Sequence, residues 1–122
     1  MDNDQKETLI KEVQWESFHD ERLKISARDD LEIIRSQVKQ GAAQLWECTS
    51  ANNHGYAVTR IDPGPELVVV LGEGSGFMEF APRFVEFAKR KNMTIRTHVT
   101  RKGMIRFWSR LGLNVDEYIL RG

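Results

Sequence analysis

The architecture of this chain is set by the segment Val70-Leu71-Gly72-Glu73-Gly74-Ser75-Gly76-Phe77. Residues 67–71 form a continuous, valine-rich apolar run, which is typical of a strand buried on both faces. Residues 77–88 place apolar side chains at helical spacing. Three alternating glycines between the two let backbone N–H groups turn toward one point, where the helix dipole adds positive potential. The segment therefore predicts a strand–loop–helix unit with an anion site in its loop.

Two observations leave another interpretation of this loop open. Glu73 and Glu79 place carboxylates near the predicted site, and these would repel an anion. The loop also lacks the lysine–serine ending of a nucleotide P-loop, and no acidic residue follows a second strand as in a dinucleotide fold. A plain connector between strand and helix is therefore the alternative to a phosphate cradle.

Outward from the loop, the pattern alternates between strands and helices. Residues 1–43 are expected to be mainly helical, with Ser26 and Asp29 capping a helix that Gly41 ends. A weak strand signal covers 9–13. Further elements are expected as strands at 44–49, 56–61, 67–71, 94–100 and 115–120, and as helices at 77–91 and 104–111.

These elements predict a single α/β domain over 1–122, with its sheet and loop core in 44–122. A strand–helix–strand unit requires a right-handed crossover, so the strands at 67–71 and 94–100 should be parallel neighbours. The other connections are hairpins. We therefore expect a mixed, mostly antiparallel twisted sheet with helices on both faces.

The composition excludes several classes of protein. The chain has 122 residues, of which 40% are hydrophobic and 30% charged, as expected for a globular domain. A lone cysteine, Cys48, rules out an internal disulfide and a multi-cysteine zinc site. No apolar run approaches the roughly 20 residues of a membrane span, and the polar, acidic first residues argue against a secretory signal. A cytoplasmic protein without a membrane partner is expected.

The charge is balanced in total but uneven along the chain. Residues 1–32 hold ten acids and five bases, whereas residues 83–110 hold nine bases and one acid, Glu86. A basic segment suggests an anionic partner, such as a phosphate-bearing cofactor, a nucleic acid or an acidic protein. The alternative is that this segment neutralises the acidic one within the domain.

The order of elements and two motifs resemble the GNAT (Gcn5-related N-acetyltransferase) superfamily over roughly 44–121. The first motif, Gln/Arg-x-x-Gly-x-Gly/Ala, aligns with Leu71-Gly72-Glu73-Gly74-Ser75-Gly76, so both glycines fit and Leu71 replaces Gln or Arg. In that family the amides of this loop hold the pyrophosphate of acetyl-CoA. The resemblance therefore implies cofactor contacts from Val69, Val70, Leu71, Gly72, Glu73, Gly74, Ser75, Gly76 and Phe77.

The second motif is the penultimate helix of the family, which often reads Asn-x-x-Ala-x-x-x-Tyr-x-x-x-Gly-Phe. Residues 101–113 align with it without a gap and end in Leu-Gly-Leu. Arg101 stands at the asparagine position, and Trp108 stands at the tyrosine that often acts as general acid. An indole N–H does not ionise in water, so Trp108 cannot shuttle a proton. It can pack against the pantetheine arm.

The resemblance implies transfer of an acyl group from acetyl-CoA to an amine, which also needs a base. The candidates are Glu66, at the start of the strand before the loop, and His98, near the end of the next strand. Imidazole ordinarily titrates near neutral pH. Alternatively, Glu66 is simply a charged residue at the start of a strand, and His98 is a solvated or hydrogen-bonded histidine without a catalytic role. His19, His54 and His98 lack ligand spacing, so no metal is expected, and Cys48 is expected to be a buried small hydrophobe.

The sequence is compatible with three candidate functions. The first is a CoA-dependent N-acyltransferase. The second is a non-catalytic structural or binding protein of the same fold, with a protein partner on the basic face. A looser resemblance of Ile105-Arg106-Phe107 and Asp116-Glu117-Tyr118 to short GNAT-like phage proteins suggests a virion location for it. The third, nucleic-acid binding through 83–110, is the least favoured. The acceptor, the acyl chain and the oligomeric state stay open.

Overall fold

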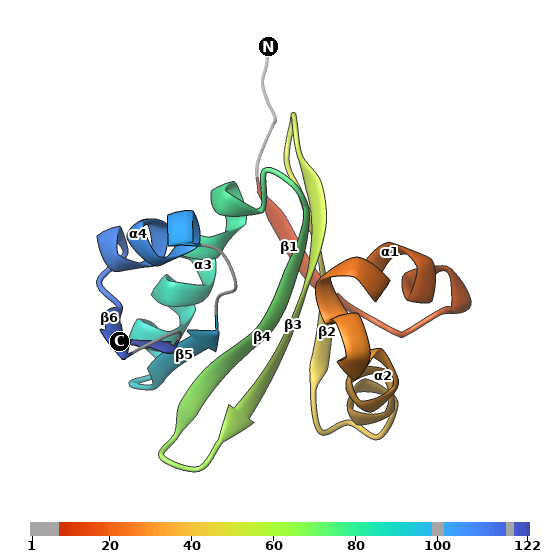
Figure 1. Cartoon of the computed structure of the whole chain (residues 1–122), viewed down its shortest axis with the longest axis horizontal. Helices are drawn as coiled ribbons and strands as arrows, with labels where there is room; N and C mark the ends of the chain where they lie inside the picture. The colour runs from red at the N-terminus through yellow and green to blue at the C-terminus, as the bar shows by residue number, and fades with distance from the viewer. Residues whose placement is uncertain (1–7, 99–101, 117–118) are drawn as a thin grey trace.

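The computed structural model describes residues 8–98, 102–116 and 119–122. Its elements follow one another along the chain as in Figure 1. They are β1 (Leu9–Val13), α1 (Ser17–Ala27), one 3-10 turn (Arg28–Asp30), α2 (Leu31–Lys39), β2 (Gln44–Thr49), β3 (His54–Asp62), β4 (Glu66–Ser75), α3 (Phe77–Arg90), β5 (Thr94–His98), α4 (Lys102–Arg110), β6 (Asn114–Asp116) and β7 (Ile119–Arg121).

The strands form one sheet in the order β1-β2-β3-β4-β5-β7-β6. β4 and β5 are parallel, and the other neighbours in the described part of the sheet are antiparallel. Helices α1 and α2 cover one face, and α3 and α4 lie on the other (Figure 1). The predicted fold class is confirmed, including the parallel pair. Within the described residues, no helix is both long and apolar enough to cross a bilayer.

The apolar residues divide into two clusters, one on each face of the sheet. The cluster under α3 and α4 includes Leu67, Val69, Phe80, Phe84, Ile95 and Trp108. The cluster under α1 and α2 includes Leu23, Ile34, Leu45, Tyr56, Val58 and Leu71. β4 contributes to both clusters because both of its faces are covered. This explains why the run at 67–71 is continuous rather than alternating.

The structure corrects the predicted start of the second helix. Ser26 lies within α1 and caps nothing; α2 begins at Leu31 after the 3-10 turn. α1 continues past Ser26 because Ala27 packs into the cluster under α1 and α2, and it stops at Arg28, whose φ is positive (54°). The weak strand signal at 9–13 is confirmed as β1. The predicted strand at 94–100 ends at His98, with residues 99–100 outside the described range, and the predicted strand at 115–120 falls on β6 and β7.

His19 is a buried titratable group in α1. Its side chain is 2% exposed, and its ring lies 5.1 Å from the Tyr56 ring. The Glu16 backbone N–H donates to His19 Nδ1 over 2.8 Å, which needs an unprotonated Nδ1. Burial lowers the pKa of His19 below its usual 6.5. The imidazole is therefore neutral in the folded protein near pH 7.

The protein should lose stability when the pH falls below about 6.5. The folded pKa of His19 is lower than the unfolded one, so the unfolded chain binds the extra proton first, and the contribution of His19 is complete only above the unfolded value. Urea unfolding at pH 7.5 and 5.5 measures this loss. His19→Gln should be less stable at pH 7.5 but should lose less between the two pH values. Equal pH dependence in both proteins would contradict this assignment.

Candidate functional site

The parallel strands β4 and β5 separate halfway along β4. They pair from Glu66↔Thr94 to Val69↔Thr97, whereas β4 continues beside β3 as far as Ser75. The β3–β4 register shifts between Val58 and Thr59, which oppose Leu71 and Val69, so Val70 is the extra residue of a β-bulge. A bulge bends its strand and increases the local twist. Among the described residues, backbone groups of β4 beyond Val69 do not pair with β5.

Thr97 closes the ladder where the strands part. Its hydroxyl donates to the Val69 carbonyl over 3.2 Å, and the residue is 4% exposed. A buried carbonyl without a partner costs about 1–3 kcal/mol. The side chain of Thr97 thus satisfies a backbone acceptor at the end of the parallel pairing.

Helix α3 begins at the far end of β4. Gly76 has a left-handed backbone (φ 70°), and its carbonyl accepts from the Glu79 N–H over 2.8 Å. The first N–H groups of a helix have no intrahelical partner, so this end carries positive potential. The predicted helix start after the glycines is confirmed.

The glycines do not form the single bend that the sequence predicts. Gly72 and Gly74 belong to β4, where they pair with Ala57 and Gly55, and the turn into α3 is Gly76 alone. The strand extends this far because two glycines face each other. A Cβ on Gly74 would lie 2.5 Å from the Gly55 Cα, so side chains at this pair would push the strands apart. Two of the three glycines of the expected cradle therefore lie in the strand.

Side chains of the protein occupy the space beside two of these glycines. The Phe77 ring lies over Gly72, where a Cβ would come within 2.5 Å of it. The Asn53 side chain, from the turn between β2 and β3, lies against Gly76. Phe77 also stacks on Phe84 with ring centroids 6.4 Å apart. Any molecule at the start of α3 would therefore contact Phe77 and Asn53 as well as backbone.

The structure places the two nearby carboxylates differently. Glu73 faces α1, where its Oε1 lies 3.2 Å from Arg22 Nη2, so it does not project toward α3 as the sequence suggests. Glu79 accepts hydrogen bonds from Asn53 Nδ2 (2.6 Å) and Ser50 Oγ (2.9 Å). These bonds lower the pKa of Glu79, so it is charged at neutral pH. One carboxylate therefore remains at the helix start.

The candidate catalytic residues are spread over the sheet. Glu66 lies at the paired end of β4, away from Gly76, with Oε1 3.4 Å from Arg96 Nε. His98 is exposed at the end of β5, one residue beyond the last β4–β5 pair. Trp108 is 2% exposed and belongs to the same cluster as Val69. The structure thus brings His98 to the strand separation and leaves Glu66 at the other end. Arg101 lies outside the described residues.

Two further expectations concern metals and Cys48. Among the described residues, no group of three or more His, Cys, Asp or Glu side chains is arranged to hold a metal ion. Cys48 is fully buried, and burial raises the pKa of its thiol to about 12. It is a small apolar residue of the core, as predicted, and not a nucleophile.

No family model and no curated protein match the chain. Solved structures do match. A Bacillus subtilis acetyltransferase in complex with CoA has a TM-score of 0.71 and 9% identity over 94% of this chain and 96% of that one. A GNAT family acetyltransferase from Elizabethkingia anophelis with acetyl-CoA bound has 0.67 and 12%, over 90% and 78%.

A third match, Ard1 from Thermoplasma volcanium, has a TM-score of 0.65 and 14% identity over 94% of this chain and 96% of that one. At sequence identities this low, structural similarity shows the fold alone. The likeness spans nearly the whole chain. This chain has the fold of the GNAT acetyltransferases.

Proposed function

We propose that the chain binds a CoA thioester where β4 and β5 separate, and that it transfers the acyl group to an amine. The observation that carries this proposal is the bulge at Val70 beside the end of the parallel pairing, with the start of α3 at the end of the same strand. The structural likeness to acetyltransferases solved with CoA or acetyl-CoA supports it.

The backbone N–H groups at the start of α3 are suited to bind a diphosphate. The left-handed Gly76 and the N-terminal amides of α3 provide donors and positive potential. The charged Glu79 opposes an anion there, although its carboxylate is held by Asn53 and Ser50. The proposed contacts are those from Val69 to Phe77, with the amides near Val69 and Val70 directed at the thioester carbonyl.

A bound thioester supplies an electrophilic acyl carbon and a thiolate leaving group. The amine nitrogen forms the new C–N bond as the C–S bond breaks, and the amine proton goes to a base. We assign this role to His98, because it lies one residue beyond the last β4–β5 pair, whereas Glu66 lies at the opposite, paired end of β4. Water protonates the departing thiolate, since the buried Trp108 has no acidic proton to give.

A binding protein without turnover is the second candidate. The Phe77 ring and the Asn53 side chain beside the glycines, together with Trp108 in the core, favour it. In that case a protein partner on the basic face of 83–110 would define the function. The cytoplasmic location expected for the enzyme, and the virion location for a phage component, both stay predictions.

Calorimetry with acetyl-CoA tests the ligand site. Met78, in the first turn of α3, is 52% exposed, so Met78→Glu adds a charge there without disturbing the core. A unit charge about 7 Å from a diphosphate costs roughly 1 kcal/mol in water, which is about a fivefold loss of affinity. Ile25→Glu, on α1 and 81% exposed, makes the same charge change on the other face and should leave affinity unchanged. Absence of binding to the folded protein at millimolar ligand, or an equal loss in both variants, would overturn the site.

Removing the negative charge at the helix start should have the opposite effect. Glu79→Gln keeps an oxygen that can accept from Asn53 and Ser50, and it should tighten acetyl-CoA binding about fivefold for the same Coulombic reason. Glu86→Gln, two turns further along α3, is the matched control and should change affinity less than twofold. Weaker binding by Glu79→Gln would show that this carboxylate positions the ligand rather than repelling it.

Acyl transfer can be followed by the release of free CoA thiol in the presence of an amine. The background is low because Cys48 is buried and its thiol pKa is about 12. His98→Asn should lower the rate at least tenfold while acetyl-CoA affinity is retained. An unchanged rate with a saturating amine would remove His98 from the mechanism. Binding of acetyl-CoA without any transfer across a panel of amines would favour the second candidate.

A further inference from the structure

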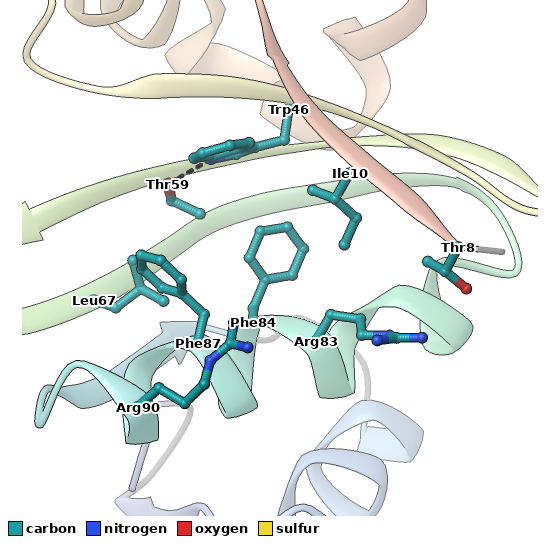
Figure 2. Close-up of a pocket in the computed structure, with 9 residues that line it drawn as sticks. All are labelled: Thr8, Ile10, Trp46, Thr59, Leu67, Arg83, Phe84, Phe87 and Arg90. Atoms are coloured by element: carbon teal, nitrogen blue, oxygen red, sulfur yellow. Dashed lines mark hydrogen bonds between the residues drawn. The ribbon is translucent and has the colours of Figure 1, made fainter.

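A cavity of about 260 Å³ lies between the sheet and α3, outside the segment 69–77. Figure 2 shows Trp46 and Thr59 on the strands facing Phe84 and Phe87 on the helix. Ile10 of β1 closes one side, and Leu67 comes from the start of β4. The cavity is therefore formed by β1, β2, β3, the start of β4 and α3, whereas the proposed CoA site lies where β4 separates from β5.

The body of the cavity is apolar. Aromatic rings of Trp46, Phe84 and Phe87 and the side chain of Ile10 provide its surface. Its buried hydroxyl, Thr59 Oγ1, accepts from Trp46 Nε1 over 2.8 Å and donates to Gln44 Oε1 over 3.3 Å. Because these polar groups are satisfied within the protein, the interior favours an apolar group over water or a polar one.

The rim of the cavity is cationic. Arg83 and Arg90 line it from α3, seven residues apart, which is about 10 Å along the helix axis. Both are exposed, and neither forms a hydrogen bond or ion pair within the described part of the chain; the charge of Arg83 acts weakly on Glu79. No carboxylate is among the described lining residues. Glu12, opposite Trp46 in the β1–β2 register, is exposed and lies outside the lining.

We propose that this cavity binds a small amphiphilic acid, with its apolar body between Trp46 and Phe84 and its acid group at the guanidinium rim. Guanidinium groups match carboxylates in planar geometry and charge. The cavity volume of about 260 Å³ is just below the usual range of about 300–1,000 Å³, so it selects a small ligand. The site is independent of the CoA proposal, because the two share neither the β4–β5 separation nor the start of α3.

Calorimetry with octanoate and octan-1-ol tests the charge requirement. Octanoate should bind at least tenfold more tightly than the neutral alcohol. Arg83→Gln and Arg90→Gln should each weaken octanoate severalfold, and together at least tenfold, while binding of the alcohol changes little. Lys89→Gln lies on the same helix but does not line the cavity, so it is the matched control and should leave octanoate affinity unchanged. A smaller loss at higher salt would be consistent with the exposed rim.

A second variant tests the apolar body. Ile10→Phe fills the cavity from an edge strand, where aromatic residues are well tolerated, and should weaken octanoate and the alcohol alike. Circular dichroism and thermal unfolding report whether each variant is folded. Equal affinity for octanoate and octan-1-ol, or octanoate affinity unchanged by the double arginine variant, would overturn the proposal. So would the absence of octanoate binding to the folded protein at millimolar concentration.

Discussion

Strand β4 has two different environments along its length, and the arrangement of the molecule depends on the change between them. Up to Val69 it pairs on both edges, with β3 and β5; after the bulge at Val70 its pairing in the described part of the chain is with β3 alone. A bulge bends its strand, and the Thr97 hydroxyl donates to the Val69 carbonyl at the last described pair with β5. The separation of β4 from β5 therefore coincides with the backbone bulge at Val70.

The glycines serve close approach as much as conformational freedom. Gly74 lets β4 come near Gly55 of β3 and itself has a positive φ (112°). Gly72 accommodates the Phe77 ring, and Gly76 makes the turn into α3. One glycine-rich segment thus combines a strand contact, an aromatic contact and a helix start. A motif read from spacing cannot distinguish these roles, because each depends on a neighbour distant in sequence.

Much of the architecture could be predicted from the sequence, since it follows from local patterns. The parallel pair follows from the apolar run at 67–71, the helical stripe after Phe77 and the right-handed crossover rule. The predicted strand at 44–49 is β2. The candidate site is less predictable, because it depends on contacts between residues that are distant in sequence. The sequence predicts Glu73 near the anion because the residue belongs to the glycine segment, but strand alternation places its side chain on the face of α1, where it pairs with Arg22. The Ser26 cap failed because burial of Ala27 outweighed the local capping signal.

The hydrogen bonds from Ser50 and Asn53 to Glu79 join the tip of the β2–β3 hairpin to the first turn of α3. Asn53 also lies against Gly76, at the spot where an anion would meet the helix. A ligand that binds there would contact Asn53 of the hairpin tip as well as the first turn of α3. The same hairpin carries Trp46 and Thr59 into the apolar cavity. The β2–β3 hairpin therefore contributes side chains both to the start of α3 and to the cavity.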